Sequence, residues 1–382
     1  MKFKVSVQDL QYALRTIRDV VPTSAAASDS AGVLISAKGD RAVFTAFNQE
    51  MFAKATIRIE NSDDGEAVVD ALALNSAVNH FIPTKEDGTG TSDVLLYTTS
   101  RSKKLHMSAK TRYASGVETP HKRVFALRSQ DFFPGLPSEN AVNISFELPA
   151  SILMDGIDSV GYALSRDANL PVFTGMLFKL SSDKLTLFAT DGVCLAEYEA
   201  PVNFRGEAQK LVIPGSFANK ITKSFFEGDT LKFFLTDSML YVRTANLVLG
   251  GVLIREQYPD YKEYFPSPNK YAYVDKHILL DNLLNLNYEA AQAEANRVKI
   301  RLEDGASSLF CGQSENGGIP SKADSYFEFD CNLKLFANSV RNVYGDNLKV
   351  GFTDNDSLIE FSSEAVDETG PNLTCLIVPL SK

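Results

Sequence analysis

The sequence predicts an α+β fold assembled from six copies of one small unit. Each copy reads as an alternating strand, a polar or proline break, and a helix of about three turns with apolar residues at i, i+3 and i+4. The first copy is FKVSVQDLQYALRTIRDVV, in which Leu10, Ala13, Leu14 and Ile17 share one helix face. The copies start roughly 55–80 residues apart, a spacing at or just above that of repeat architectures.

The other copies follow the same order along the chain. They are EAVVDALALNSAVNHF, ISFELPASILMDGIDSVGYAL, QKLVIPGSFANKITKSFF, YAYVDKHILLDNLLNLNY and YFEFDCNLKLFANSVRNV. A β-hairpin of two alternating runs is expected after every helix, as in GMLFKLSSDKLTLFAT. One helix and a small sheet cannot close a core alone, so we pair the copies into three similar domains. The expected domains span residues 1–140, 141–267 and 268–382, with boundaries marked by Pro134, Pro137, Pro266 and Pro268.

The composition is that of a soluble globular protein. Of 382 residues, 44% are hydrophobic and 23% are charged. No apolar run reaches the ~18 residues of a membrane helix, and the first residues alternate instead of forming a signal peptide. We therefore expect a cytoplasmic protein without membrane contact. The scattered cysteines are expected to be buried, reduced thiols; they are Cys194, Cys311, Cys331 and Cys375.

Nothing in the sequence points to catalysis. The motifs GxSxG and HExxH are absent, and the glycine-containing run at 87–91 lacks the GK[ST] ending of a phosphate loop. Asp191 ends a predicted strand, but no partner base recurs at the equivalent place in the other copies. The isolated histidines argue against a metal site. We expect neither enzyme activity nor a cofactor, and a nuclease or hydrolase on an α+β scaffold is the alternative class.

Charge is unevenly placed. The net charge of −10 excludes a protein that coats nucleic acid with its whole surface but permits a local basic lining. Each basic residue on a helix fits a solvated face, but together they predict a shared surface for phosphate contacts without sequence preference. These candidate residues are Arg15, Arg18, Arg166, Lys220, Lys223, Lys334 and Arg341.

A second asymmetry separates the ends of the chain. Residues 101–123 are basic and include Arg101, Lys103 and Lys104, whereas residues 281–330 are rich in acids. Opposite charge on the first and third domains favours a head-to-tail contact between two copies. The alternative is an exposed basic hairpin without a partner.

Three segments carry a family resemblance. They are LPVFTGMLFKLSSDKLTLFATDGVCLAEYEA (170–200), KLVIPGSF (210–217) and QYPDYKEYFP (257–266). In order and spacing they resemble the bacterial DNA polymerase III β subunit family, the sliding clamps, where P-x-L-x-G, A-T-D-G-x-x-L-A, V-x-V-P and F-P-D-Y-x-x-x-x-P follow one another. The opening MKFKVSVQDLQYAL and the ending CLIVPLSK resemble the ends of that family.

The resemblance implies the DNA clamp fold: a head-to-tail homodimer ring with three similar domains per chain, helices lining the hole and sheets outside. Such a ring encircles double-stranded DNA, tethers a DNA polymerase, has no catalytic activity, and is opened and closed by a clamp loader ATPase. The runner-up is a clamp-like scaffold that recruits or sequesters repair, transcription or host replication proteins.

The resemblance also implies a groove for a partner peptide with aliphatic and aromatic anchors. Matched by motif, the groove residues are Phe173, Thr190, Gly192, Leu195, Pro259, Leu376, Val378, Pro379 and Leu380. The chain departs from the family at Val193-Cys194, where a His-Arg pair is usual, and at the tail. Departures of this kind are expected in a diverged member of the family, for example one encoded by a virus. Phe173 predicts a shallower, more aromatic groove. Val193 and Leu380, where the family has histidine and methionine, predict that the groove holds its peptide by burial more than by hydrogen bonds.

Ring closure is expected between the late strands of the first domain and a helix of the third, around Leu283 to Tyr288. The candidate interface residues are Lys103, Lys104, Phe125, Leu127, Leu283, Leu286 and Glu289. Apolar burial would supply most of the free energy, and charge would set the orientation.

Overall fold

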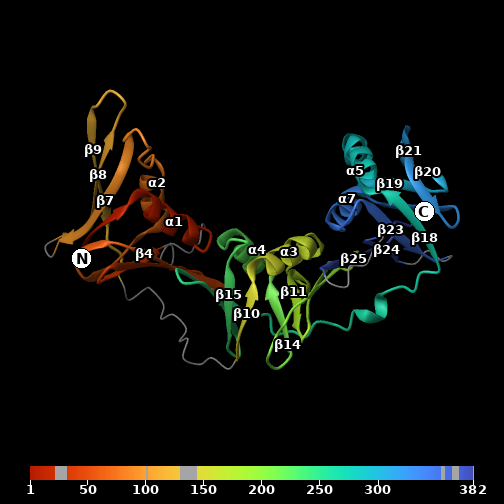
Figure 1. The fold of residues 1–382 in the computed structure, drawn as a ribbon, viewed down its shortest axis with the longest axis horizontal. Helices are drawn as coiled ribbons and strands as arrows, with labels where there is room; N and C mark the ends of the chain where they lie inside the picture. Colours follow the sequence, from red (N-terminus) through yellow and green to blue (C-terminus); the bar gives the residue numbers. More distant parts are fainter. Residues whose placement is uncertain (22–31, 100–101, 130–143, 354–357, 364–369, 382) are drawn as a thin grey trace. The chain divides into compact units, whose positions relative to one another are not determined.

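Six strands lead directly into helices in the described part of the chain, as the repeat predicts (Figure 1). The computed structural model describes residues 1–21, 32–99, 102–129, 144–353, 358–363 and 370–381. The strand–helix pairs are β1 (Lys2–Ser6) with α1 (Val7–Arg18), β6 (Gly65–Asp70) with α2 (Ala71–Asn79), β10 (Ile144–Pro149) with α3 (Ala150–Val160), β14 (Gln209–Pro214) with α4 (Gly215–Ser224), β18 (Lys270–Asp275) with α5 (Lys276–Asn285), and β22 (Phe327–Asn332) with α7 (Leu333–Asn342).

The residue at each strand–helix junction explains the abrupt turn. In four units the junction side chain accepts a hydrogen bond from a backbone N–H of the first helical turn, and these caps are Ser6, Asp70, Asp275 and Asn332. Such a cap satisfies one of the amides that a helix start leaves without a partner. The other two junctions carry proline, Pro149 and Pro214, whose fixed φ suits the helix start.

A three-stranded antiparallel meander follows each helix, so the predicted hairpin is its first part. The meanders are β2 (Gly32–Lys38), β3 (Arg41–Phe47) and β4 (Met51–Arg58); β7 (Gly90–Thr99), β8 (Ser102–Arg112) and β9 (Glu118–Ala126); β11 (Gly175–Leu180), β12 (Lys184–Thr190) and β13 (Cys194–Pro201); β15 (Thr230–Leu235), β16 (Met239–Arg243) and β17 (Leu247–Val252); β19 (Arg297–Leu302), β20 (Gly305–Cys311) and β21 (Ser314–Ala323); and β23 (Asn347–Phe352), β24 (Ile359–Ser363) and β25 (Asn372–Ile377).

Shorter elements lie between these. They are the strand β5 (Glu60–Asp63), the helix α6 (Asn287–Gln292), and the 3₁₀ turns η4 (Gly161–Ala163), η5 (Pro171–Thr174), η6 (Lys262–Tyr264) and η7 (Glu294–Asn296). The fifth helix was expected to continue to Tyr288, but α5 ends at Asn285 and α6 begins at Asn287.

The chain divides into two compact units. Unit 1 is Met1–Ser145 with Thr230–Val252, and unit 2 is Phe146–Asp229 with Leu253–Lys382. The predicted boundaries of three domains, at residues 140 and 267, stay a prediction. Pro134, Pro137 and Arg101 lie outside the described residues.

Unit 1 contains two sheets. One has the order β5-β1-β7-β8-β9, and the strands of this unit in the other follow the order β15-β16-β17-β4-β3-β2-β6. The helix α1 packs on β4 and α2. Its predicted face is confirmed, because Leu10, Ala13, Leu14 and Ile17 are all fully buried.

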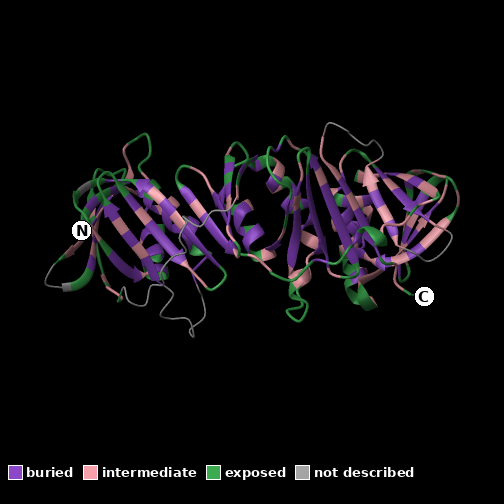
Figure 2. Ribbon diagram, turned by 90° about the horizontal axis from the view of Figure 1, so that it is seen from below, coloured by how far each residue is buried: buried purple, intermediate pink, exposed green. Residues whose placement is uncertain are grey.

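Unit 2 is built on one continuous sheet with the order β14-β11-β12-β13-β25-β24-β23-β18-β21-β20-β19-β22. The helix α3 packs on β12, β13 and α4, and α7 packs on α5, β22 and β25. A hydrogen bond between Tyr162 Oη and Ser339 Oγ, 2.8 Å long, links the two halves, and Asn342 donates to the carbonyl of Ser159. Most strand residues are buried or intermediate and the connecting loops are exposed (Figure 2).

The expected state of the cysteines is confirmed: all four are buried and free. Burial raises the pKa of the Cys375 thiol to about 12, so it is protonated and unreactive at neutral pH. None of the helices in the described part of the chain combines the length and hydropathy needed to span a bilayer.

Close packing of α3 on the sheet predicts a sharp size limit at Gly156. A Cβ atom built there would lie 2.7 Å from the ring of Tyr198, which is fully buried and donates to the carbonyl of Ile152. We expect Gly156→Ala to lower the free energy of unfolding by about 1–3 kcal/mol, as overpacked cores do. Gly161→Ala is the matched control, because nothing lies within 4 Å of its Cβ position. Equal melting temperatures for the two variants would contradict the packing.

Candidate functional site

The basic residues of α1 border a polar cleft in unit 1. Arg15 and Arg18 are exposed on this helix, and the cleft of about 420 Å³ runs between α1 and α2. Amide side chains complete its lining, which is Gln8, Gln11, Tyr12, Arg15, Arg18, Asn75 and Asn79. Guanidinium and amide donors of this kind suit phosphate oxygens.

In unit 2 the helices present a mixture of charges. Lys223, Lys334, Arg341 and Arg166 are exposed, on α4, on α7 and after η4. The expectation for Lys220 needs correction. This residue is only 5% exposed, because it lies on the buried face of α4. The predicted surface contact of Lys220 is therefore wrong, and the other candidates stay predictions.

The helix α3 adds acid instead of base. A pocket of about 570 Å³ beside this helix is lined by Asp155, Asp158, Tyr198 and Glu227, among other residues. Burial, together with the nearby Asp155 carboxylate, raises the pKa of Asp158. These carboxylates make the surface beside α3 locally unfavourable for phosphate oxygens.

An aromatic cluster is the most specific feature of unit 2. Its buried members are Leu177, Phe188, Leu195, Val212, Tyr258, Tyr261 and Leu376, and the half-buried residues packed against it are Val172, Phe173, Ile254, Phe265 and Leu358. The Phe188 ring stacks on Tyr261 with 3.6 Å between centroids and meets Tyr258 edge-on at 5.6 Å. Phe173 meets Tyr258 edge-on at 5.7 Å. Three separate parts of the chain thus share one apolar core.

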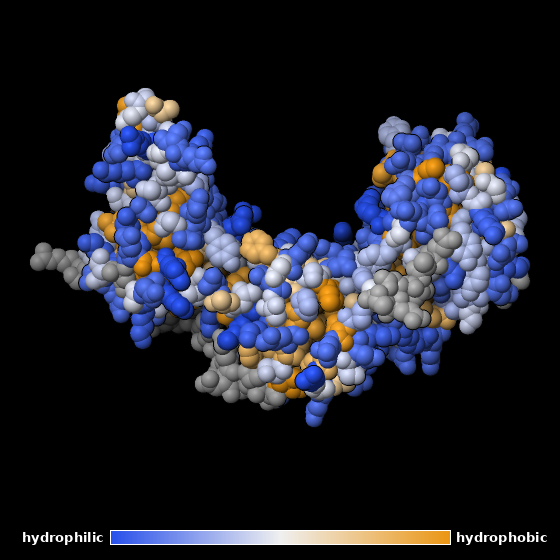
Figure 3. Space-filling view, viewed as in Figure 1, coloured by the Kyte–Doolittle hydropathy of each residue, from blue (hydrophilic) through white to orange (hydrophobic). Residues whose placement is uncertain are grey.

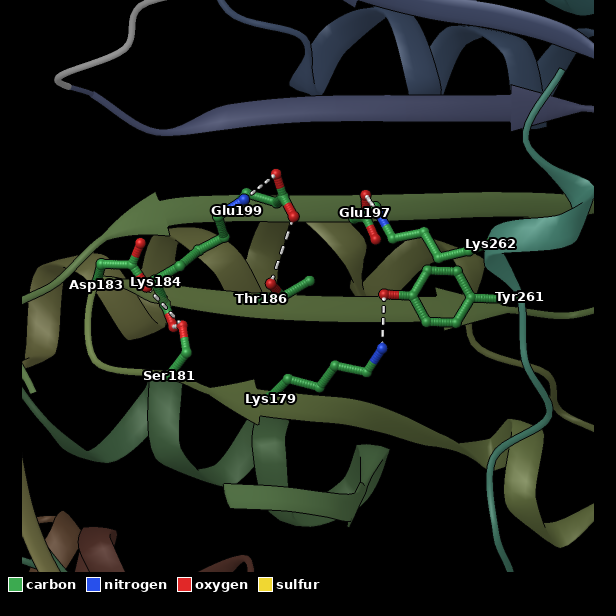
Figure 4. A network of polar contacts seen from close by, with 9 residues as sticks. All are labelled: Lys179, Ser181, Asp183, Lys184, Thr186, Glu197, Glu199, Tyr261 and Lys262. Atoms are coloured by element: carbon green, nitrogen blue, oxygen red, sulfur yellow. Dashed lines mark hydrogen bonds and ion pairs between the residues drawn. The ribbon is translucent and has the colours of Figure 1, made fainter. Parts of the chain in front are cut away.

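The segment 253–269 is fastened across the β11–β12–β13 meander by polar contacts (Figure 4). Lys262 Nζ forms an ion pair with the Glu197 carboxylate, and residue Glu197 is 5% exposed. Lys179 Nζ donates to the Tyr261 hydroxyl at 3.3 Å and lies over its ring. Burial lowers the pKa of Lys179, and nearby Lys210 adds to this. These contacts hold Tyr258 and Tyr261 in register with the sheet.

The C-terminal tail runs along the rim of the cluster. The Val378 amide donates to the carbonyl of Val193 at 2.9 Å, and the Leu380 amide donates to the carbonyl of Asp330 at 2.7 Å. Leu170, Val193 and Val378 are exposed apolar residues, and each lies two residues along the chain from a residue of the cluster or packed against it. Hydrophobic atoms gather on the part of unit 2 that carries β11 and β14 (Figure 3).

The structure brings together only part of the predicted groove. Phe173, Leu195 and Leu376 belong to the cluster. Thr190 shapes the adjoining turn, since its hydroxyl donates to the carbonyl of Cys194 and accepts from the amide of Gly192, whose φ of 89° suits glycine. The remaining candidates border it or lie apart: Pro259 is exposed, Val378 and Pro379 are at the rim, and Leu380 is not among the cluster's described residues.

Sequence reasoning missed most of the aromatic members. Phe188 and Tyr261 lie inside quoted motifs, but their contact needs the 253–269 segment to fold back onto β12. Tyr258 occupies the position where the family pattern has phenylalanine, so the sequence already indicated an aromatic residue there. Phe173 packs against this aromatic cluster, and the shallower, more aromatic groove expected there stays a prediction.

The predicted interface residues of the third domain need correction. Leu283 and Leu286 are buried in unit 2 itself, because Leu279 and Leu283 form the inward face of α5. The exposed apolar side chains of α5 and α6 are Ile278, Leu284 and Tyr288, the last of them 77% exposed. Glu289 is half-buried beside them.

In unit 1 the interface candidates keep their surface positions. Lys103 and Lys104 are exposed on β8, and Phe125 and Leu127 are half-buried. Phe125 also lines a pocket of about 540 Å³ with Phe81, Ile82 and Tyr113. Among the described residues, no group of three His, Cys, Asp or Glu side chains is placed to hold a metal ion.

The Lys262–Glu197 pair predicts that substitutions of its two members have nonadditive effects on the stability of the 253–269 segment. Lys262→Met leaves the buried Glu197 carboxylate without its cation and should cost about 1–3 kcal/mol, below the range for a fully buried pair because Lys262 is half exposed. Lys262→Met combined with Glu197→Gln should recover most of that loss. Lys184→Met, at the more exposed pair with Glu199, is the control and should cost less than about 1 kcal/mol. Hydrogen exchange of residues 253–269 measures the effect, and equal protection in all variants would disprove it.

Two family models match the chain in consecutive order. The N-terminal domain of the DNA polymerase III beta subunit matches residues 1–86, and its central domain matches residues 147–260. The beta sliding clamp of Chlamydia muridarum is 22% identical over 367 residues, which is 93% of both chains. That of Staphylococcus aureus is 24% identical over 334 residues, or 84% of each.

Solved structures agree over the full length. A sliding clamp from Pseudomonas aeruginosa superposes with a TM-score of 0.87 at 16% identity, covering all of both chains. The sliding clamp of Bacillus subtilis gives a TM-score of 0.85 at 17% identity, covering 100% of this chain and 99% of the other. These likenesses confirm the predicted clamp fold. With the family models, they show that the chain belongs to the DNA polymerase III beta subunit family.

Proposed function

We propose that this protein is a sliding clamp, a ring-shaped processivity factor that encircles double-stranded DNA and tethers a replicative DNA polymerase. The observation that carries the proposal is the match of both family models, in order, within a chain that the Chlamydia muridarum clamp matches over 93% of its length. The work of such a protein is topological, so it needs no catalytic residues and no cofactor. It acts on DNA in the cytoplasm, with a clamp loader ATPase to open it.

The charge pattern supports a ring that stays on DNA because it encircles the duplex, and not because it binds the duplex tightly. The chain carries a net charge of −10, and α3 carries carboxylates that line a pocket of unit 2. The surviving channel candidates are Arg15, Arg18, Arg166, Lys223, Lys334 and Arg341. A few phosphate contacts give binding that is weak, salt-dependent and independent of sequence. Such binding permits sliding.

The groove for the polymerase is proposed at the aromatic cluster of unit 2. Its rim exposes Leu170, Val193 and Val378, which offer apolar area to a peptide, and the half-buried Phe173 forms its floor. Apolar walls with few polar groups are typical of a peptide site. The clamp-like scaffold that recruits or sequesters repair, transcription or host replication proteins would use the same surface, so it is the second candidate.

A nicked circular duplex tests the topological link. Protein diluted to open rings and reconcentrated with the circle should co-elute with it in gel filtration at high salt, where direct contacts are screened. Cutting the circle once should release the protein. A linear duplex of equal length is the control. Equal retention on both DNA forms, or turnover of the DNA, would refute the clamp. Restored processivity of a polymerase on a primed circle separates the clamp from the scaffold.

The corrected interface predicts which apolar residue closes the ring. Tyr288, the most exposed large apolar side chain of α6, should bury against the late strands of unit 1 in a second copy. Tyr288→Asp should weaken the dimer at least tenfold, since a carboxylate would enter an apolar contact. Tyr264→Asp, at an exposed tyrosine of η6, is the matched control. Sedimentation at several concentrations measures the dissociation constant, and an unchanged value for Tyr288→Asp would exclude this contact.

A further inference from the structure

Unit 1 covers one face of its sheet β5-β1-β7-β8-β9 with helices. The helix α1 packs on β1 and β7, and α2 packs on α1 and β9, so both lie on the same side of the sheet (Figure 1). The strand side chains that point toward them are buried and apolar; they are Phe3, Val5, Leu96, Leu105 and Met107. Successive side chains of a strand point to opposite faces, so the residues between these lie on the other side. We call that side the outer sheet face, and in its middle lie Lys2, Tyr97, Lys104, His106, Lys122 and Val124.

Two aromatic rings stack in the middle of the outer sheet face. Tyr97 on β7 stands opposite His106 on β8, and their ring centroids lie 4.9 Å apart with 12° between the ring planes. Both residues are only half-buried, and Val124, opposite His106 on β9, is 53% exposed. A planar group from outside can extend such a stack, because offset aromatic rings attract one another.

Lysines surround this ring pair. Lys104 precedes His106 by two residues on β8, and Lys122 on β9 is diagonal to His106 across the ladder. Both positions are about 7–8 Å from His106 on the same face of the sheet. Lys2 stands opposite Tyr97 on the other side of the pair. All three lysines are exposed.

The acids of the outer sheet face lie farther from the rings. They pair with other lysines, in the contacts of Lys4 with Asp93 and Glu60 and of Lys110 with Glu118. Asp63 stands opposite Lys2 on β5 and offsets part of its charge. Lys104 and Lys122 therefore supply most of the positive charge beside the ring pair.

We propose that the outer sheet face of unit 1 binds single-stranded nucleic acid, with one base stacked on the Tyr97–His106 pair and the flanking phosphates bound by Lys104 and Lys122. Aromatic and cationic groups side by side on an open sheet suit this ligand, since every base has a flat face and every nucleotide carries a charge. In a duplex the neighbouring bases cover these flat faces. The ring pair thus favours an unpaired strand.

The proposed site is separate from the contacts with duplex DNA. The channel candidates Arg15 and Arg18 lie on α1, which packs on the opposite side of this sheet. The inference therefore goes beyond the proposed clamp function and does not rest on it. Lys104 is also a candidate for the contact between two copies, so the test uses Lys122.

Two labelled oligomers of equal charge form the probe. One is an oligothymidylate of about 12 nucleotides, within the size range of a single-strand site, and the other has the same length and backbone but no bases. Fluorescence anisotropy at low salt measures their binding to the wild type, Tyr97→Leu and Lys122→Gln. The matched controls are Tyr113→Leu, at a tyrosine that lines the pocket beside α2, and Lys38→Gln, at an exposed lysine of β2.

The proposal expects the two substitutions to act differently. Tyr97→Leu should weaken the oligothymidylate about tenfold and leave the abasic oligomer unchanged, because only stacking is lost. Lys122→Gln should weaken both oligomers alike and reduce the slope of log K against log salt by about 0.7. Both controls should match the wild type.

A measurement on the wild type guards against a folding defect in Tyr97→Leu. An oligothymidylate that carries one 5-iododeoxyuridine is irradiated in complex with the full chain, and the crosslinked peptide is sequenced. The crosslink should fall on Tyr97 or His106. A crosslink elsewhere in the chain would overturn the proposal.

Four other results would also overturn it. Equal binding of the two oligomers to the wild type, or their displacement by an oligoglutamate of the same charge as readily as by oligothymidylate, would mean that the surface recognises negative charge alone. A loss of oligothymidylate binding in Arg15→Gln as large as in Lys122→Gln would place the strand on the helices. A changed dimer dissociation constant in Lys122→Gln with unchanged oligomer binding would assign the face to the contact between copies.

Discussion

Antiparallel pairing of β13 with β25 is the interaction on which unit 2 depends. The ladder runs from Cys194 opposite Ile377 to Glu199 opposite Asn372, and it joins two smaller sheets into one. It sets Leu195 directly opposite Leu376, and both belong to the aromatic cluster. A slip of one residue would turn every side chain of β25 to the wrong face of the sheet. The core and the proposed peptide site are therefore fixed by one register.

The 253–269 segment completes what this ladder begins. It has little regular structure, yet it carries two of the largest side chains of the cluster. Tyr261 stacks on Phe188, and Lys262, itself half exposed, pairs with the buried Glu197; these two contacts position the segment. The carboxylate of Glu197 can be buried only because a cation meets it, so the charge pair gives the segment a defined position as well as stability.

The repeated unit explains how proteins with so few identical residues can share this fold. A strand, a cap, a helix and a meander require apolar residues at set intervals and a capping side chain at the junction, but few particular residues. The four relatives named above share 16–24% of their residues with this chain, and the two solved structures among them still superpose over its full length. Side chains that these requirements do not fix can differ from the family pattern, as Phe173 and Tyr258 do.

The sequence by itself determined the local structure. Period-2 and period-3.6 apolar patterns, separated by a polar or proline break, were enough to predict six strand–helix units, because those signals act within a few residues. In the structure four of these breaks contain the helix caps Ser6, Asp70, Asp275 and Asn332. The order of motifs also indicated the family and part of the cluster.

Only the tertiary structure decided which side chains reach the surface. In the sequence, Lys220 and Leu283 cannot be distinguished from residues of the same type nearby that are exposed, such as Lys223 and Leu284. In the structure both Lys220 and Leu283 are buried. Burial depends on which other elements pack against a helix, and those contacts join residues far apart in the chain. The same reason hid the stacking of Phe188 on Tyr261, because that contact joins two residues that lie far apart in the chain.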